Sequence, residues 1–437
     1  MNAFKFLTMS LVLCLAVVGK ANTQNFDTRL EYFSVDNGEA EFTIPGEVRV
    51  NQAVAPTRDQ VDPIIRKQMR FMFGLMRSRE LSPAALYPKF SFTTTAVQPN
   101  GKNSFIVKYS LKAKGLFQNN LTEYTFNIPY NPITLFAESQ GKCMVGEEAE
   151  ESNFWYHWEP LKPDCPLKEN VNYYTVKAPL TRIANTTQTY PEYAKLVDNE
   201  KTIKMTMFFG FEHYDFQTWD PDTNADDWGI RSINLQRNFL KQAGFKETAW
   251  TNEQVAKIYV AKDKFIPHVY EMTMAGSTAN LRIRLVLADT GLAHNSSAFH
   301  AFLRNSLAQE SVVVYDGHSG IGKNLDLASI EKLRGFKFAM NPNYQILFLG
   351  SCVPYAYYPD MFFSRKKSAT DVNGSLKLDI FTYGKESVFG NNEDHELTKA
   401  LVAFATQNLK KSYQQIVRAS PNYYFGINGD EDNPTNP

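Results

Sequence analysis

The segment from Ser311 to Cys352 constrains the fold of this chain more than any other stretch. It begins with an apolar, β-branched run that ends shortly before His318, continues with helical spacing, and closes with a second apolar run just before Cys352. Strand, helical crossover and strand in about 35 residues is the length of a βαβ unit. Because its two strands are parallel, His318 and Cys352 are expected beyond two carboxyl ends, at the edge where open α/β sheets bind ligands. An imidazole and a thiol there suit nucleophilic catalysis.

The overall composition bounds the number of domains and the kind of partner. The length of 437 residues favours two or three domains, at about 150 residues for each. Lysine and arginine total 46, as do aspartate and glutamate, so the formal net charge is zero. This balance gives no indication of binding to nucleic acid or to an anionic membrane surface. We therefore expect no nucleic-acid partner, and the oligomeric state is left open.

Residues 1–21 have the pattern of a secretory signal sequence. Lys5 supplies a short positive region, an apolar run extends from Phe6 to Val18, and small residues precede a cut after Ala21. The apolar run is too short to span a bilayer comfortably, and no other stretch approaches the length of a transmembrane helix. The sequence therefore predicts a secreted or periplasmic protein without a membrane span, in a bacterial setting.

The cysteines fit this predicted export. Cys14 leaves with the signal sequence, and Cys143 and Cys165 lie in one loop-rich segment. In an oxidising compartment these two are expected to form a disulfide bond with each other. Cys352 is left over, and an odd thiol in an exported protein is either a reactive nucleophile or a buried apolar side chain. Its position at the end of a predicted strand shifts the weight toward the nucleophile.

Two regions with different patterns follow the signal sequence. Residues 22–199 contain short β-type runs around one amphipathic helix from Pro63 to Arg77, which predicts a strand-rich α+β domain. Residues 200–428 alternate strands and helices, which favours an α/β domain with a mostly parallel sheet and helices on both faces. The tail, residues 429–437, is acidic and rich in Pro and Asn and is expected to be disordered. The first domain could dock the second, bind a partner or restrain activity.

Two motifs in the second domain follow one another in a recognisable order. An apolar strand runs into Gly317 and His318, and after a crossover the next apolar strand runs into Ser351 and Cys352. This order resembles the caspase, gingipain and clostripain group of cysteine peptidases, which carry a His-Gly at one strand end and a Cys, usually after a small residue, at the next. The resemblance covers residues 203–384 and does not extend to the first domain. It implies a caspase-like fold that hydrolyses peptide bonds.

The resemblance also implies a role for individual residues. Cys352 would be the nucleophile, since a thiol with the ordinary pKa of about 8.5 is already slightly ionised at neutral pH. His318 would protonate the leaving amine and assist formation of the thiolate. The oxyanion would be held by backbone N–H groups of Cys352 and of Ser319, the residue after the histidine.

The chain departs from the group's pattern at two positions. Relatives have Gly where this chain has Ser319, with Gly320 next, and the difference matters only if the position needs a positive φ. Pro354 stands two residues after the cysteine, where relatives often have Gly. Proline removes an N–H and biases Val353 away from the helix, which puts the usual entry into the following helix in doubt.

The same segment admits two other functions. One is a caspase-like fold that has lost its chemistry and serves as a binding or surface protein. The other is phosphate or nucleotide binding, because Gly317–Asn324 matches G-x-x-x-x-G-K after a strand. Asn324 lacks the hydroxyl that a P-loop offers to magnesium, and no helix is expected to open at Lys323. Peptide hydrolysis, with a peptide or protein substrate, is the preferred hypothesis.

A third kind of site, for calcium, is suggested by polar residues after Trp219. They stand at alternate positions, as in a calcium loop: Asp220, Asp222, Asn224 and Asp226. Ala225 occupies the position where such a loop needs Gly, and Arg231 the position of its bidentate Glu. A solvated acidic turn is therefore preferred over calcium binding, and no other cofactor is predicted.

Overall fold

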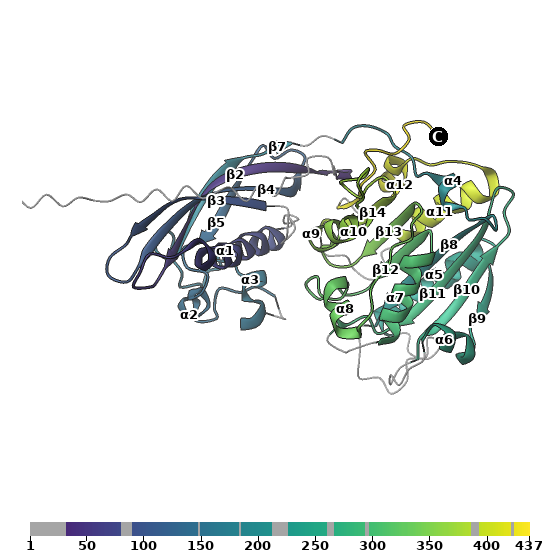
Figure 1. Cartoon of the computed structure of the whole chain (residues 1–437), viewed down its shortest axis with the longest axis horizontal. Helices are drawn as coiled ribbons and strands as arrows, with labels where there is room; N and C mark the ends of the chain where they lie inside the picture. Colours follow the sequence, from purple (N-terminus) through teal and green to yellow (C-terminus); the bar gives the residue numbers. More distant parts are fainter. Residues whose placement is uncertain are drawn as a thin grey trace, which may run out of the picture.

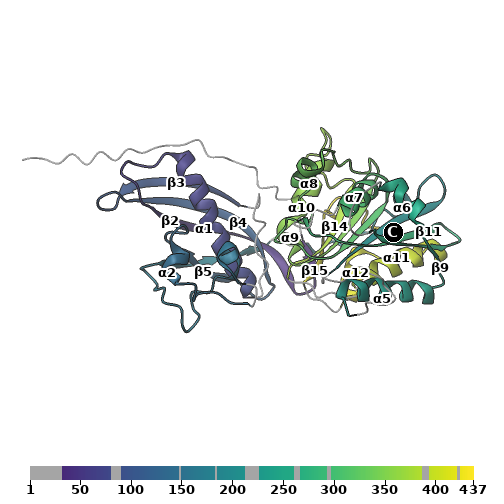
Figure 2. The same cartoon turned by 90° about the horizontal axis from the view of Figure 1, so that it is seen from below.

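The computed structural model describes residues 32–79, 90–146, 149–182, 185–211, 226–259, 266–292, 297–385, 393–420 and 424–437. These residues form a smaller and a larger lobe that lie next to each other along the long axis of the molecule (Figure 1, Figure 2). The signal sequence predicted for residues 1–21 lies outside the described residues. Within the described parts of the chain, every helix is too short or too polar to span a membrane.

Parallel strands form the centre of the larger lobe. In spatial order they are β11 (Asn280–Ala288), β8 (Thr202–Gly210), β12 (Val312–Asp316), β13 (Gln345–Gly350) and β14 (Leu378–Tyr383). Antiparallel strands extend the sheet on both sides, namely β10 (His268–Met274) and β9 (Lys246–Ala249) beyond β11, and β15 (Phe425–Asn428) beyond β14. The strand order reverses between β8 and β12. In open α/β sheets, ligands bind at the carboxyl edge near such a reversal.

Helices cover both faces of this sheet (Figure 1). One face packs against α5 (Trp228–Gln242), α11 (Glu393–Gln407) and α12 (Tyr413–Ala419). The other packs against α6 (Asn252–Ile258), α7 (Ser297–Gln309), α8 (Leu327–Arg334) and α10 (Pro359–Lys366). Successive residues of a strand alternate between faces, so Val312 and Val314 join the first core and Val313 and Tyr315 the second. The predicted α/β class is confirmed.

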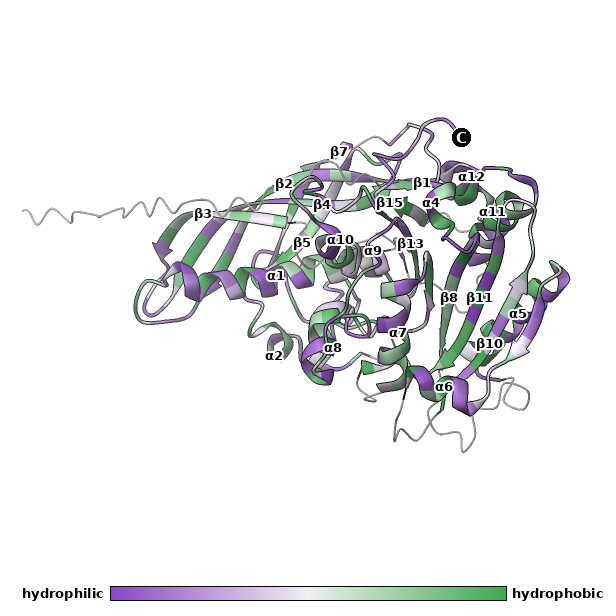
Figure 3. Cartoon of the chain, turned by 45° about the vertical axis from the view of Figure 1, so that its right-hand side comes forward, coloured by the Kyte–Doolittle hydropathy of each residue, from purple (hydrophilic) through white to green (hydrophobic). Residues whose placement is uncertain are grey.

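The central strands β12 and β13 are buried on both faces because helices cover both faces of the sheet. Figure 3 shows hydrophobic residues running along the strands at the centre of this lobe. All residues of β13, and all of β12 except Asp316, are buried. A strand covered on both sides reads as a continuous apolar run, which is why the sequence indicated these two strands clearly.

The smaller lobe consists of long antiparallel strands crossed by one helix. β2 (Asn37–Val50) pairs with β4 (Phe105–Gln118), which pairs with β3 (Phe90–Pro99), and α1 (Arg58–Ser78) packs on one face. β5 (Glu123–Pro129) and β6 (Tyr173–Pro179) form a separate ribbon, and β7 (Thr181–Arg182) pairs with β2. The short strand β1 (Phe33–Ser34) pairs with both β2 and β15, so one sheet runs through both lobes.

The predicted disulfide bond joins Cys143 to Cys165 in the smaller lobe. The two cysteines flank α3 (Phe154–His157) and pack with Trp158 against α1. The nearby α2 (Leu135–Ser139) belongs to the same apolar cluster. The Nδ1 atom of His157 lies 2.8 Å from the carbonyl oxygen of Val145, so this histidine has a structural contact inside the disulfide loop.

Removing this disulfide bond is expected to destabilise the chain. The two cysteines are 22 residues apart, and closing a loop of that size restricts the unfolded chain by about 3 kcal/mol. We expect Cys143→Ser combined with Cys165→Ser to lower the free energy of unfolding by that amount. Urea unfolding followed by circular dichroism measures it. An unchanged midpoint in the double variant would show that the loop is restricted without the bond.

The C-terminal tail differs from the disorder expected for residues 429–437. Asp430 and Asn433 are buried, and the Nδ2 atom of Asn433 donates to the carboxylate of Asp379 at 2.8 Å. The hydroxyls of Tyr344 and Tyr413 donate to the same carboxylate. Composition suggested a disordered acidic tail, but Asp432 and Asn433 find partners inside the larger lobe.

The tail also binds the segment that links the two lobes. The carboxylate of Asp430 accepts a hydrogen bond from the Thr189 hydroxyl. It accepts a second one, at 3.3 Å, from Nδ2 of Asn185. The backbone N–H of Tyr190 donates to the Pro434 carbonyl at 2.9 Å. The tail and the linker therefore pack against each other beside the amino ends of β13 and β14.

The buried Asp430 predicts a pH dependence of stability. Burial raises the pKa of Asp430 from 3.8 to about 6, so the folded chain binds a proton between these values that the unfolded chain has lost. This contribution is fully present below pH 4 and is lost as the pH rises through 6, about 3 kcal/mol in all. Burial lowers the pKa of His395 to about 4, which acts in the opposite direction.

A comparison with Asp430→Asn removes the contribution of His395, because His395 is the same in both chains. We expect the difference in unfolding free energy between the parent and this variant to fall by about 3 kcal/mol between pH 4 and pH 7. Urea unfolding at both pH values measures the difference. A constant difference would mean that Asp430 titrates at its ordinary pKa.

Candidate functional site

The structure brings His318 and Cys352 to the same edge of the sheet. β12 and β13 are parallel neighbours, and Asp316 is the register partner of Gly350. His318 follows Asp316 by two residues, and Cys352 follows Gly350 by two residues. The backbone N–H of Gly317 donates to the Gly350 carbonyl at 3.2 Å. The two segments therefore remain hydrogen-bonded at the residue that follows β12. His318 and Cys352 therefore occupy equivalent positions beyond the carboxyl ends of two neighbouring strands.

Buried polar side chains fix the backbone around His318. The carbonyl of His318 accepts hydrogen bonds from the Tyr315 hydroxyl at 2.7 Å and from Nδ2 of Asn324 at 2.9 Å. The carbonyl of Ser319 accepts one from the Tyr358 hydroxyl at 3.0 Å. Burial raises the pKa of Tyr358 well above its ordinary value, so this hydroxyl remains a donor over the working pH range. The loop is therefore held in one place while the His318 side chain stays partly exposed.

Cys352 lies in a strained turn. It is partly buried and outside the disulfide bond. The next residue, Val353, has φ +50° and ψ +43°, a left-handed conformation that β-branched residues rarely adopt. Its N–H donates to the Lys385 carbonyl at 3.0 Å, and Pro354 begins the short helix α9 (Pro354–Tyr357). Such strain costs about 1–3 kcal/mol, and strained residues cluster at functional sites.

The serine after His318 is compatible with this loop. Positive φ values occur at the three residues that follow it, Gly320 (56°), Ile321 (54°) and Gly322 (82°), and Ser319 has none. The loop therefore turns after the serine. A Cβ atom on Gly320 would lie 2.5 Å from Oδ1 of Asn324, so this glycine is the residue that the turn needs.

The tyrosines that follow Cys352 have different environments. Tyr355 and Tyr358 are buried, whereas Tyr357 is partly exposed. A Cβ atom on Gly322 would lie 2.9 Å from Cγ of Tyr357, so the Tyr357 ring covers the loop that follows His318. The sequence did not indicate that Tyr315, Asn324 and Tyr358 donate to the carbonyls of His318 and Ser319. Such a hydrogen bond from a side chain to a backbone carbonyl has no sequence pattern.

The geometry around α8 does not favour the phosphate-binding interpretation. The Asp326 carboxylate caps α8 and accepts from the N–H groups of Ala328 (3.1 Å) and Ser329 (3.3 Å), which a bound phosphate would need. Asn324 is engaged elsewhere, since its Oδ1 accepts from the N–H of Leu292 at 3.2 Å. Asn324 therefore ties the loop after β12 to the loop after β11.

The calcium hypothesis falls mostly on residues that the structure does not describe. Asp220, Asp222 and Asn224 lie outside the described residues, and Asp226 is exposed. The neighbouring Asp227 caps α5 by accepting from the N–H of Ile230 at 3.0 Å. Among the described residues, no three His, Cys, Asp or Glu side chains come together as a metal would require. Calcium binding stays an untested prediction.

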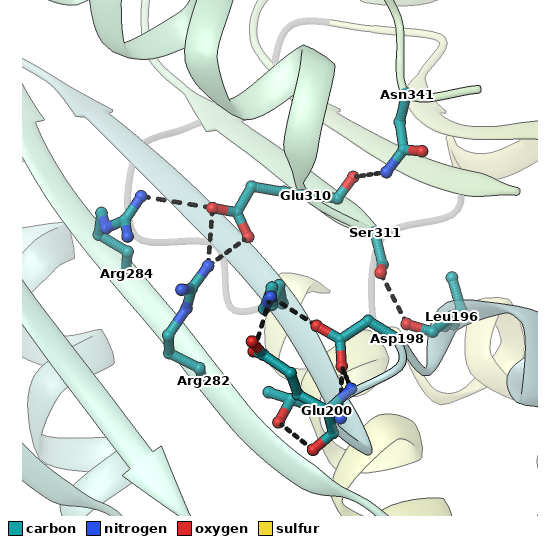
Figure 4. A network of polar contacts seen from close by, with 10 residues as sticks. Leu196, Asp198, Glu200, Arg282, Arg284, Glu310, Ser311 and Asn341 are labelled. Carbon is teal, nitrogen blue, oxygen red and sulfur yellow. Dashed lines mark hydrogen bonds and ion pairs between the residues drawn. The ribbon is translucent and has the colours of Figure 1, made fainter. Parts of the chain in front are cut away.

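A separate polar network lies at the amino edge of the sheet (Figure 4). Glu310 is buried and faces Arg282 at 3.0 Å and Arg284 at 3.3 Å. Lys204 pairs with Asp198 and Glu200 nearby. The pairs of Glu310 join the start of β12 to β11, and the pairs of Lys204 join β8 to the turn before it. We interpret them as structural supports far from His318 and Cys352.

The carboxyl edge thus offers an imidazole and a thiol from adjacent parallel strands, each in a loop that buried groups hold in place. That combination suits transfer of an acyl group to sulfur, with the imidazole moving protons. Comparison of this chain with protein-family models, with curated proteins and with solved structures found no match.

Proposed function

We propose that this chain is an exported cysteine peptidase that uses Cys352 and His318. The observation that carries the proposal is the register of β12 and β13, which places both residues two positions beyond a matched pair. The strained Val353 and the fixed carbonyl of His318 support it, because active sites hold their groups in place at a cost in strain. The predicted signal sequence and the disulfide bond support export.

In the proposed reaction, the Cys352 thiolate attacks the carbonyl carbon of a peptide bond. Backbone N–H groups of Cys352 and Ser319 stabilise the oxyanion, and the glycines on either side, Gly317 and Gly320, let the loop approach the substrate. His318 gives its proton to the leaving amine, which leaves an acyl group on the sulfur. His318 then takes a proton from water, the hydroxide releases the acid, and the thiolate is restored.

A caspase-like fold is part of this proposal. The resemblance requires neighbouring parallel strands with a helical crossover between them, and β12, α8 and β13 have that arrangement. The chain returns past β8 to β12, so His318 follows a strand at the reversal and Cys352 follows the next strand, β13. The proposed substrate is a peptide or an unfolded protein that can reach this edge.

Hydrolysis of fluorescently labelled casein by the purified chain tests the proposal. We expect release of labelled peptides, complete inhibition by iodoacetamide, and no inhibition by a metal chelator. A purified, folded chain that leaves casein and a mixed peptide library intact, also after addition of calcium and after limited proteolysis, would rule the peptidase out.

The partial burial of Cys352 favours one alternative, a non-catalytic binding protein on the same fold. In that case the thiol is a packing residue, and it would react with iodoacetamide no faster than a buried cysteine. A fast reaction of Cys352, mapped by mass spectrometry, contradicts this alternative.

Lys323→Ala separates the peptidase from the phosphate-binding hypothesis. Lys323 is exposed, and the Asp326 carboxylate occupies the N–H groups of Ala328 and Ser329 at the start of α8. We therefore expect casein hydrolysis by Lys323→Ala within twofold of the parent. Isothermal calorimetry with ATP and with inorganic phosphate should show no binding to either chain. Phosphate binding that Lys323→Ala abolishes would support the nucleotide hypothesis instead.

A further inference from the structure

The short helix α9, which follows Cys352, lies against the smaller lobe. Both views of the molecule place it at the boundary between the lobes (Figure 1, Figure 2). Its residue Tyr355 is fully buried, three positions after Cys352. The chain between them is short, so the position of Tyr355 limits where the thiol can lie.

Glu39 of the smaller lobe and Tyr32 at the boundary between the lobes hold Tyr355. Its hydroxyl donates a hydrogen bond to Oε1 of Glu39 at 2.6 Å. The ring of Tyr32 contacts the Tyr355 ring edge-on, with the centroids 5.1 Å apart, and Leu116 completes this small apolar cluster. Glu39 belongs to β2 and Leu116 to β4, so the contact comes from the end of the smaller lobe's sheet.

Tyr32 is itself anchored to the larger lobe. Its hydroxyl donates to the Tyr424 carbonyl at 2.7 Å and to the Thr382 carbonyl at 3.2 Å. A Cβ atom on Gly426 would lie 2.3 Å from the Tyr32 ring, so β15 accepts this ring because it has glycine there. β1 continues from Tyr32 and pairs with β15, which fixes the boundary on a second side.

Contact between the lobes does not by itself require a buried carboxylate, because burying one costs free energy. Glu39 is 1% exposed and Tyr355 is 0% exposed. Apolar contact is non-directional and would join the lobes without the cost of burying a carboxylate. A short phenol–carboxylate hydrogen bond is directional, so it fixes the rotation of Tyr355 and the turn of backbone before it.

The turn before Tyr355 needs such support. Val353 stays in its left-handed conformation only while its surroundings impose it. One side of the turn is fixed by β13 and by the hydrogen bond from Val353 to Lys385. The other side is fixed through Tyr355 by Glu39.

We propose that Glu39 of the smaller lobe and Tyr32 at the boundary between the lobes are positioning residues for Cys352, acting through Tyr355. The smaller lobe is then a part of the working site and not a restraint that must be removed. This inference rests on the proposed function, since it concerns the reactivity of the same thiol. It predicts that a substitution at the boundary contact changes the reactivity of Cys352 although no residue at the carboxyl edge is substituted.

The test measures the rate of Cys352 alkylation by iodoacetamide from pH 5 to pH 10. The full chain carries Cys14→Ser, and Cys143 and Cys165 form the disulfide bond. Cys352 is then the one thiol that iodoacetamide can alkylate. Tyr355→Phe keeps the ring and removes the hydroxyl. The matched control is Tyr109→Phe, because the Tyr109 hydroxyl also donates a buried 2.6 Å hydrogen bond, to Gln68 within the smaller lobe.

We expect Tyr355→Phe to slow alkylation at pH 7 at least fivefold and to move the apparent pKa of the thiol toward that of a free cysteine. Tyr109→Phe should stay within twofold of the parent in both quantities. Superimposable profiles for Tyr355→Phe and the parent would overturn the inference. If Tyr355→Phe does not fold, Glu39→Gln, which keeps the side-chain volume, decides the question by the same measurement and thresholds.

Casein hydrolysis separates this inference from the proposed function. A parent that hydrolyses casein, with an unchanged alkylation profile in Tyr355→Phe, retains the peptidase and rejects the positioning role. A parent that leaves casein intact, with a changed profile in Tyr355→Phe, rejects the peptidase and retains the positioning role.

Discussion

Replacing Cys352 by alanine is expected to abolish peptide hydrolysis, with kcat/KM for labelled casein lowered by about 10⁴-fold or more. The sulfur is the atom that forms the acyl intermediate, and alanine offers no nucleophile in its place. His318→Ala removes the proton donor for the leaving amine and should cost about 10²–10⁴-fold. Initial rates on casein, at equal concentrations of folded chain, measure both losses.

The double variant sharpens this prediction. Residues that act as one unit are strongly non-additive, so Cys352→Ala combined with His318→Ala should be no less active than Cys352→Ala alone. Thermal unfolding should show all three variants folded, because both side chains are partly exposed to solvent. Residual activity in Cys352→Ala close to that of the parent would assign the hydrolysis to other residues or to a contaminant.

Deleting residues 430–437 is expected to lower the free energy of unfolding by about 3–5 kcal/mol. The deletion removes Asn433, which donates to the buried carboxylate of Asp379 together with Tyr344 and Tyr413. It also removes Asp430, which holds Thr189 of the linker. Breaking a buried polar network by removing one side leaves the other side unpaired, which is the expensive case.

A shorter deletion is the matched control for the tail. Residues 435–437 are exposed, and removing them leaves the carbonyl of Pro434 bound to Tyr190. We expect this control to change the unfolding free energy by less than about 0.5 kcal/mol. Urea unfolding of both chains gives the comparison. Equal stability of the two deletions would show that the tail contributes nothing to folding.

The strands around the candidate site could be predicted from sequence for a clear physical reason. β12 and β13 are buried on both faces, so each is a short apolar run that ends in polar or small residues. A crossover of the right length then makes them parallel. Their exact register, Asp316 beside Gly350, needed the structure, because a sheet pairing between distant residues has no local signal.

The tail shows where composition misleads. An acidic, Pro-rich end suggests disorder when charges are counted without their partners. One signal was available, since Asp379 interrupts the apolar run of β14, and a carboxylate inside such a strand must find donors. Which donors it finds, two tyrosines and Asn433 from the tail, could not be read from the sequence.

The boundary between the lobes was equally hidden. The predicted division at residues 199 and 200 did not reveal that β1 joins the sheets of the two lobes. β1 has two residues, too few for a periodic pattern. Glu39 and Tyr355 are 316 positions apart, and nothing near either residue indicates the other.

The pH dependence of Cys352 alkylation, compared between the parent and His318→Ala, tests the central claim most directly. It needs no substrate and reports whether the imidazole and the thiol interact. We predict that the parent reacts as a thiolate below pH 7, and that His318→Ala loses this reactivity and titrates near the ordinary pKa of about 8.5. Identical profiles for the two chains would contradict the claim that His318 and Cys352 form one site.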